Sequence, residues 1–128
     1  MSVFVLALAA CGGPLKFNIK GTPKAPDLDC KIQANVADEQ GITLLQMQLD
    51  HLAPPDRFAS GATHFVAWSK GGESYNRVGA LKYDKDKRTG ALEATSPDVS
   101  FVLIITAEGK VNPAAPSTTI ILEQKIAK

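Results

Sequence analysis

The chain has 128 residues, which is enough for one domain with its own hydrophobic core. Its 14 Lys and Arg residues nearly balance its 13 Asp and Glu residues, and hydrophobic residues make up 45% of the chain. This composition is that of a globular protein and excludes a disordered one. The formal net charge of +1 gives no basic surplus of the kind that nucleic-acid-binding proteins carry, so we expect no nucleic-acid partner.

The N-terminal segment combines a short apolar run with small residues and a cysteine. Residues 3–8 are apolar, and they lead into Leu8-Ala9-Ala10-Cys11, which Gly12-Gly13-Pro14 follow. The apolar run is too short to span a bilayer but has the length of a signal-peptide core. The sequence around Cys11 resembles the lipobox of bacterial lipoproteins, in which an apolar residue and two small residues precede a cysteine.

This resemblance implies a division of the chain into three parts. Residues 1–10 would be a lipoprotein signal peptide, residues 11–14 a tether that begins with lipidated Cys11, and residues 15–128 the folded domain. Met1-Ser2 lack the Lys or Arg with which a signal peptide starts. Either the true start lies upstream of Met1, or the segment is a first strand or an apolar tail.

Lipidation of Cys11 would give the protein a location and a first partner. The lipid chains would hold it in a membrane of the bacterial cell envelope, since each buried CH₂ adds about 0.8 kcal/mol. The residue after Cys11 is Gly12 rather than an acidic residue. In lipoproteins of the enteric type, that choice implies the outer membrane rather than the inner membrane.

Beyond the tether, alternating apolar and polar residues and intervening turn residues predict a series of short strands. The segment 42–52 is ambiguous, because Ile42, Leu45, Leu49 and Leu52 also form a helical stripe. Gly41 and Thr43 favour a strand there, so we predict a strand. The predicted strands cover residues 15–20, 29–37, 42–52, 63–69, 77–83, 91–95, 100–106 and 118–123.

Eight strands at intervals of about 8–14 residues are typical of a β-sandwich or barrel and not of a βαβ fold. The segment 100–106 is apolar on both faces, as expected of a central strand. The Asp84 to Gly90 segment and the Gly71-Gly72 pair are turns between neighbouring strands. We therefore predict an all-β chain with a single antiparallel β-sandwich.

Several stretches of the second half form a more specific pattern. They are Leu52-Ala53-Pro54-Pro55, Gly61 to Trp68, Val78-Gly79-Ala80-Leu81, Phe101 to Glu108 and Pro113 to Ile121. They resemble the "LPP … G-x-x-Y-x-x-W", "x-G-x-[FL]" and "F-x-V-T-x-E" stretches, the proline-marked loop and the last strand of the extracytoplasmic domain of anti-sigma-K-type factors.

The resemblance covers about the last 80 residues and implies an immunoglobulin-like sandwich of about 7–8 strands outside the cytoplasmic membrane. No sigma-binding helices and no transmembrane helix precede the domain in this sequence. We therefore do not expect anti-sigma activity. The chain is instead similar to small bacterial lipoproteins that carry such a domain alone.

Trp68 is the single tryptophan and lies in a predicted central strand. Such an aromatic usually packs in the core, and we expect this of Trp68. The alternative is an exposed platform for a ligand, with Val66 and then His64 on the same face of the strand. Trp68 and His64 are therefore the candidate ligand contacts.

Metal and thiol chemistry have little support. A zinc site needs three or four protein ligands, and the chain offers His51, His64 and Cys30 once Cys11 is lipidated. Cys30 falls on the apolar face of its strand, which predicts a buried thiol, with a reactive thiol as the alternative. Asp84 to Arg88 begins like a calcium loop but places Arg at position five, so we expect a solvated turn.

No nucleophile motif and no glycine-rich phosphate loop occurs, so we expect no enzyme and no cofactor. The preferred interpretation is a non-enzymatic lipoprotein whose sandwich presents loops to a protein or another envelope component. The candidate loops are residues 53–61, 70–76 and 110–117. The alternatives are a structural envelope component without a dedicated ligand, and a periplasmic domain that binds a small molecule or metal.

Overall fold

A computed structural model describes residues 13–128 and shows nine strands and one 3-10 helix in them. The elements, in chain order, are β1 (Leu15–Lys20), β2 (Asp29–Ala37), β3 (Ile42–Asp50), the helix η1 (Pro55–Arg57), β4 (His64–Gly71), β5 (Ser74–Ala80), β6 (Lys82–Asp84), β7 (Thr89–Ser96), β8 (Phe101–Glu108) and β9 (Ile120–Ile126). No helix within residues 13–128 is long and apolar enough to cross a membrane.

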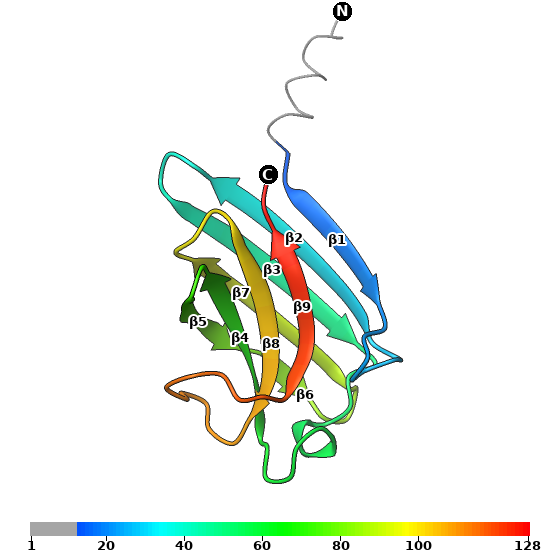
Figure 1. Cartoon of the computed structure of the whole chain (residues 1–128). Helices are drawn as coiled ribbons and strands as arrows, with labels where there is room; N and C mark the ends of the chain where they lie inside the picture. Colours follow the sequence, from blue (N-terminus) through cyan, green and yellow to red (C-terminus); the bar gives the residue numbers. More distant parts are fainter. Residues whose placement is uncertain (1–12) are drawn as a thin grey trace, which may run out of the picture.

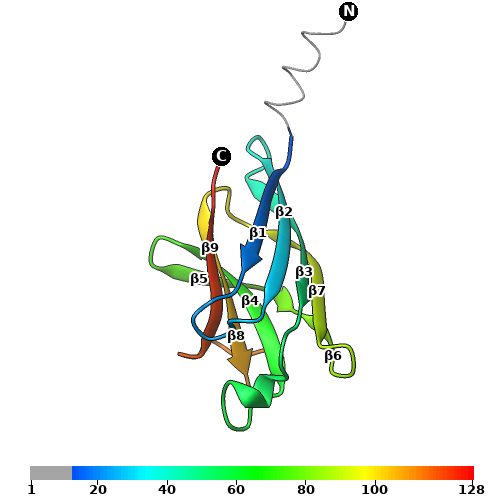
Figure 2. The same ribbon diagram turned by 90° about the vertical axis from the view of Figure 1, so that its right-hand side faces the viewer.

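The strands form two antiparallel sheets that pack face to face (Figures 1 and 2). One sheet has the order β1-β2-β3-β7-β6, and the other has the order β5-β4-β8-β9. The prediction of an all-β sandwich is therefore confirmed. With β2 to β9 taken as strands A, B, C, C′, D, E, F and G, the order becomes A-B-E-D and C′-C-F-G, which is the immunoglobulin-like arrangement. β1 is an additional edge strand beside β2.

The ambiguous segment 42–52 is a strand up to Asp50. β3 pairs with β2 on one side and with β7 on the other. Leu45, Met47 and Leu49 are buried against the second sheet, while Gln46 and Gln48 are exposed. The alternating pattern therefore predicts this segment correctly and the helical stripe does not. The strand hydrogen-bonds to a neighbouring strand on each side, and one of its faces packs in the core.

The predicted strand 77–83 is wrong, because the chain changes sheets within it. β5 ends at Ala80 in the four-stranded sheet, and β6 begins at Lys82 in the five-stranded sheet. Between them, Leu81 is buried and its N–H donates to the carbonyl of Phe65 at 2.8 Å. This crossing is why the described residues form nine strands where the sequence predicts about eight.

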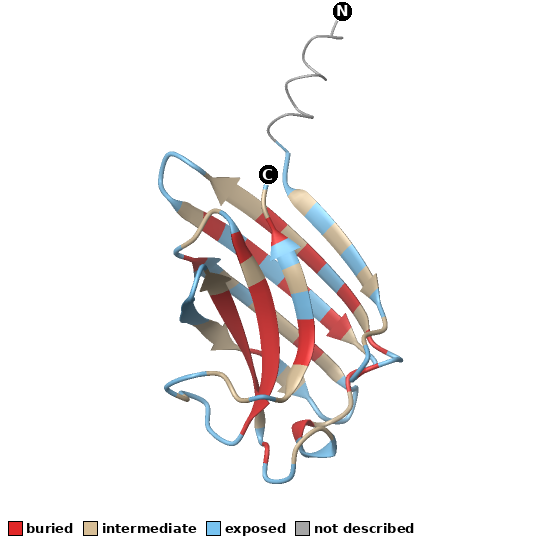
Figure 3. Cartoon of the chain, viewed as in Figure 1, coloured by how far each residue is buried: buried red, intermediate tan, exposed pale blue. Residues whose placement is uncertain are grey.

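The core lies between the two sheets, where each strand contributes the side chains of one face (Figure 3). Its aromatic part is a stack of Phe58, Phe65 and Tyr83, with ring centres 5.9 and 5.2 Å apart and edge-to-face angles. This geometry is the one that aromatic pairs prefer. The stack connects Phe58, which directly follows η1, to β4 of one sheet and to the edge strand β6 of the other, and so fixes the loop that carries η1.

The sandwich has two distinct ends. At the proximal end, the chain enters β1 at Leu15, which pairs with Ala34, and Lys128 forms an ion pair of 3.0 Å with Asp38. The distal end is where β1 and β3 finish and β2 begins (Figure 1). The three longest connections, residues 21–28, 51–63 and 109–119, lie at the distal end together with the short turn of residues 85–88.

Candidate functional site

Cys11, the predicted lipidation site, lies outside the described residues, as do the predicted signal peptide and the start of the tether. The described chain begins with Gly13 and Pro14, directly before β1 at the proximal end. The lipid anchor and the envelope location stay predictions.

Trp68 is buried, with 2% of its surface exposed, but it does not lie between the sheets. On β4, Phe65 and Ala67 face the core, whereas Val66 and Trp68 face outward and form a second apolar cluster with Ile104. The Trp68 indole N–H donates to Thr106 Oγ1 at 2.9 Å. Trp68 is therefore buried as expected, but on the outer face of the sheet and not in the core between the sheets.

Hydrogen bonds around Trp68 hold the β8–β9 loop, residues 109–119, against this outer face. Thr106 Oγ1 donates to Glu108 Oε2 at 2.5 Å, and the Ser117 N–H donates to the same oxygen at 2.8 Å. On the other side, the Arg77 guanidinium donates twice to the Val111 carbonyl, at 3.0 and 2.8 Å. The loop therefore lies on the sheet and does not project freely from it.

The two histidines lie apart from each other. His64 starts β4, is half-buried, and has its Nδ1 2.8 Å from Thr63 Oγ1. His51 follows β3 at the distal end, where its Nδ1 lies 3.6 Å from Asp29 Oδ2. Within residues 13–128, no group of three or more His, Cys, Asp or Glu residues could hold a metal ion.

Cys30 is a core residue with 1% of its surface exposed. Burial, together with the nearby negative charge of Asp50, raises its pKa to about 12. A thiol reacts as the thiolate, and this environment keeps the proton on sulfur at neutral pH. The geometry therefore favours the buried, inert thiol over the reactive one.

The loops of the distal end form a depression, here called the distal hollow, with a volume of about 770 Å³. The loops β1–β2, β3–β4 and β6–β7 enclose it. Its walls carry four cationic side chains, two carboxylates and His51. It is lined by Lys24, Ala25, Pro26, Asp27, His51, Ala53, Arg57, Phe58, Asp86, Lys87 and Arg88.

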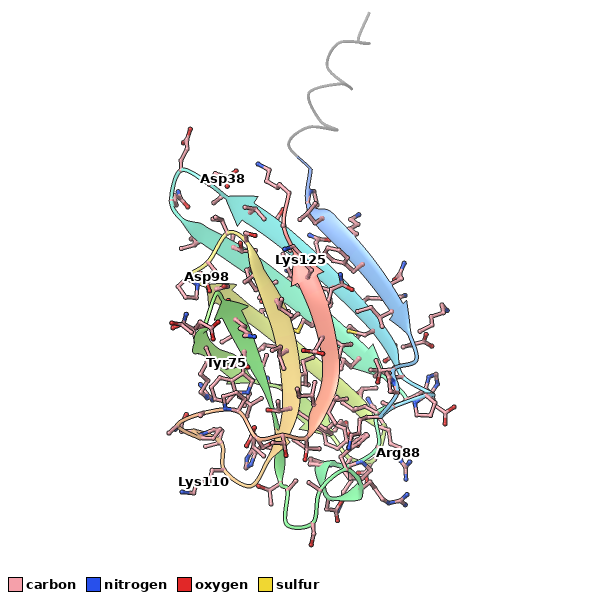
Figure 4. The ribbon with its side chains drawn as sticks, viewed as in Figure 1. Asp38, Tyr75, Arg88, Asp98, Lys110 and Lys125 are labelled. Atoms are coloured by element: carbon pink, nitrogen blue, oxygen red, sulfur yellow. The ribbon has the colours of Figure 1, made fainter. Side chains whose placement is uncertain are left out.

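Two lining residues of the distal hollow have a left-handed backbone. His51 has φ 59° and Arg88 has φ 57°, and they are the non-glycine residues with positive φ in residues 13–128. The two loops are joined directly, because the Leu52 N–H donates to the Arg88 carbonyl at 2.9 Å. Figure 4 shows Arg88 at the end of the sandwich away from Asp38.

A second depression, of about 800 Å³, lies on the outer face of the five-stranded sheet. Its charged residues are Lys16, Lys31, Lys82 and Glu93. Lys16 and Lys82 belong to β1 and β6, the two edge strands, where lysine commonly prevents pairing with other sheets. Because an antiparallel sheet often presents one solvated polar face, this face needs no ligand to explain it.

The three candidate loops have different places in the structure. Residues 53–61 include Ala53, Arg57 and Phe58 of the distal hollow, and residues 110–117 lie on the outer face near Trp68. Residues 70–76 are not a loop but the end of β4, a two-residue turn and the start of β5. The structure therefore places two of the three segments at the distal end.

Sequence reasoning considered His51 only among the possible zinc ligands and placed Arg88 in a solvated turn. The signal it missed is that both stand where a turn requires the left-handed backbone that glycine supplies most easily. The contact between their loops depends on the pairing of β3 with β7, where Leu49 lies opposite Gly90. That pairing is not encoded near either residue.

Comparisons with protein-family models, with curated proteins and with solved structures found no match. The strand order defines the class of the described chain as a single immunoglobulin-like β-sandwich domain. The similarity to anti-sigma-K-type extracytoplasmic domains rests on the sequence motifs alone and stays a prediction.

Proposed function

We propose that this protein is a non-enzymatic, lipid-anchored binding domain of the bacterial cell envelope. It contacts a protein or another envelope component through the distal end of its sandwich. The observation that carries the proposal is the polarity of the fold, in which the chain enters at one end and the longer loops and the distal hollow lie at the other.

The anchor would sit at the proximal end, close to where β1 starts. Acylated Cys11 would be followed by only three residues before Leu15. β1 then leads away toward the distal end over about 17 Å, at about 3.4 Å per residue. A domain held in this way turns its distal loops away from the membrane, and Gly12 after the anchor favours the outer membrane.

The non-enzymatic part of the proposal is supported by where the reactive groups lie. Ser69 and Ser96 are fully buried and hydrogen-bonded to each other at 2.9 Å, and Ser69 donates to Asp98 Oδ2 at 2.6 Å. These bonds tie β4 to β7 and to the segment after it. Asp98 could accept a proton from Ser69, but both serine hydroxyls are fully buried, so neither is accessible for attack on a substrate.

Crosslinking from the two ends of the sandwich tests the proposal. A photoreactive amino acid replaces Asp56, an exposed residue of η1 at the distal end, or Glu39, an exposed residue of the β2–β3 turn at the proximal end. Illumination of intact cells is expected to give a discrete adduct from position 56 and none from position 39.

Two results would contradict the proposal. Equal adducts from both positions would mean that the contacts are not directed to the distal end. The absence of any adduct would favour the alternative, a structural envelope component without a dedicated ligand. Loss of envelope integrity in a deletion strain would then support that alternative.

A further inference from the structure

We propose that the distal hollow binds the phosphate group of a phosphorylated ligand. The proposal rests on the proposed function in one respect, namely that the distal end is the contact surface, and it adds the chemistry of the group that is bound. It is carried by the charges of the hollow, by the backbone of His51 and Arg88, and by the contacts that fix their loops.

The charges of the hollow leave a surplus of two positive charges. Lys24, Arg57, Lys87 and Arg88 are cationic, against the two carboxylates of Asp27 and Asp86. Among the described residues, none of these four cations has a carboxylate within 4.0 Å. A phosphomonoester carries a charge of about −1.5 to −2 at pH 7 and so matches this surplus, whereas a single carboxylate balances half of it.

The two arginines supply hydrogen-bond donors that suit such a group. An arginine guanidinium presents its N–H donors as a planar fork that can bind two oxygens of one phosphate. Arg57 comes from the β3–β4 loop and Arg88 from the β6–β7 loop, so they approach the hollow from different segments. A phosphate between them would be held from two directions.

The left-handed backbone of His51 and Arg88 costs conformational free energy. Six residues of the described chain have positive φ, and four of them are glycine. Any residue with a Cβ is disfavoured there by about 1–2 kcal/mol. The two exceptions both line the same hollow. Strained backbone of this kind concentrates at functional sites.

Hydrogen bonds from the sandwich and within the turn hold the loops that carry His51 and Arg88. The Tyr83 hydroxyl donates to the Leu52 carbonyl at 2.5 Å, next to the Leu52–Arg88 backbone bond. Tyr83 itself packs on Phe65 in the core. In the β6–β7 turn, Asp84 Oδ1 accepts the N–H groups of Asp86 and Lys87 at 3.0 and 3.1 Å. The backbone of the hollow is therefore set before a ligand arrives, which lowers the entropic cost of binding.

The test is a titration of the full-length chain carrying Cys11→Ser, followed by its backbone amide resonances. Inorganic phosphate at constant ionic strength is expected to shift the amides of residues 51–53, 56–58 and 84–89 in a saturable way, and acetate is expected to bind at least tenfold more weakly. No saturable shift with phosphate, or equal affinity for acetate, would overturn the proposal.

A matched pair of variants locates the site. Arg88→Gln and Lys85→Gln remove the same charge from the same turn, but Lys85 does not line the hollow. We expect Arg88→Gln to weaken phosphate binding at least tenfold and Lys85→Gln to change it less than twofold. Equal losses in the two variants would mean diffuse attraction to a basic surface and would overturn the proposal.

A third variant separates binding from folding. Arg88→Gly relieves the left-handed strain, so its Tm is expected to equal or exceed that of the parent chain while phosphate binding falls at least tenfold. Retained binding in this folded variant would contradict the role of Arg88.

Two further arms distinguish the sources of the phosphate. Glucose 1-phosphate represents a diffusible phosphoester, and phosphatidylcholine vesicles with or without phosphatidic acid represent a lipid headgroup. Binding to phosphatidic acid that Arg88→Gln abolishes and inorganic phosphate competes away supports a headgroup. Binding of glucose 1-phosphate without vesicle binding supports a diffusible ligand, and vesicle binding that Arg88→Gln leaves unchanged counts against the site.

The outcomes also separate this inference from the proposed function. If position 56 still crosslinks to a partner in cells while phosphate gives no shift, the phosphate inference fails and the proposed function stands. If phosphate binds at Arg88 but position 56 gives no adduct, the proposed contact through the distal end fails and the phosphate site remains.

Discussion

Cys30 illustrates how a single residue's chemistry follows from its place in a strand. It alternates with Lys31 and shares its face with Ile32 and Ala34, both of which are buried. The sulfur is thereby removed from water, and its pKa rises to about 12. This inert thiol could be expected from the period of two alone, because that pattern determines which residues face the core.

The raised pKa of Cys30 predicts a loss of stability at high pH. The folded chain keeps the thiol proton up to about pH 12, whereas the unfolded thiol ionises near its ordinary value of 9.0. The contribution is complete below pH 9 and declines as pH rises from 9 to 12, by up to about 1.4 kcal/mol per pH unit. Urea unfolding measured from pH 8 to 11 checks this slope.

The matched control for this prediction is Cys30→Ala, which lacks a titratable group at that position. Its free energy of unfolding is expected to fall less steeply with pH than that of the chain carrying Cys30. In a thiol-reagent assay at pH 8 on the chain carrying Cys11→Ser, Cys30 is expected to react only after unfolding. Rapid modification of the folded protein would show that the thiol is accessible and the burial argument wrong.

Arg88 shows the limit of residue-level reasoning. Its charge and its place in a turn are readable from the sequence, but its left-handed backbone and its contact with Leu52 are not. These depend on where the turn begins and on which strand lies beside it. The sequence could therefore predict a solvated turn and could not predict the wall of a hollow.

At the scale of single elements, alternation predicted the bounds of the first strands well, in the edge strand β1 as in the central strand β2. The bounds predicted for β1 and β2 agree with the structure, and β3 ends two residues earlier than predicted. The β5–β6 segment failed because alternation says which residues share a face and not to which sheet the strand belongs. Only the burial of Leu81, with its bond to Phe65, reveals the crossing.

Trp68 failed in part for a related reason. Its strand and its burial were predicted, but the sandwich has apolar groups on the outer face of the four-stranded sheet as well as in the core. β8 contributes to both, because Leu103 and Ile105 point inward while Ile104 packs with Trp68 outside. Because β8 is apolar on both faces, Trp68 on the neighbouring strand β4 could pack against either face. The sequence therefore does not predict which face Trp68 occupies.

The β8–β9 loop gives a prediction at this scale. Glu108→Ala leaves the Thr106 hydroxyl and the Ser117 N–H without their acceptor, in surroundings that are largely buried. We expect the free energy of unfolding to fall by about 1–3 kcal/mol, and Trp68 fluorescence to become more accessible to acrylamide as the loop loosens. Urea unfolding and quenching measure the two effects.

Glu123→Ala is the control, because Glu123 is an exposed residue of β9 in the same sheet. Its effect is expected to stay within about 0.5 kcal/mol, as is usual for surface positions. If Glu108→Ala had an equally small effect and left Trp68 as protected as before, the hydrogen bonds to Glu108 would not hold the loop.

At the scale of the whole molecule, the two ends of the sandwich have different tasks in this account. The proximal end receives the chain from the tether and holds the C-terminal Lys128 beside Asp38. The distal end gathers the loops of three strand connections around the distal hollow. The two sheets and their shared core form a rigid frame between the two ends. This frame holds the contact surface at a fixed place relative to the anchor.

The location of the protein depends on Cys11, and metabolic labelling with a fatty-acid analogue tests it most directly. Cells that produce the natural chain are compared with cells that produce Cys11→Ser, and both are separated into soluble and membrane fractions. We predict a labelled natural chain in the membrane fraction and an unlabelled variant that leaves it. An unlabelled natural chain in the soluble fraction would contradict the account of a lipid-anchored domain.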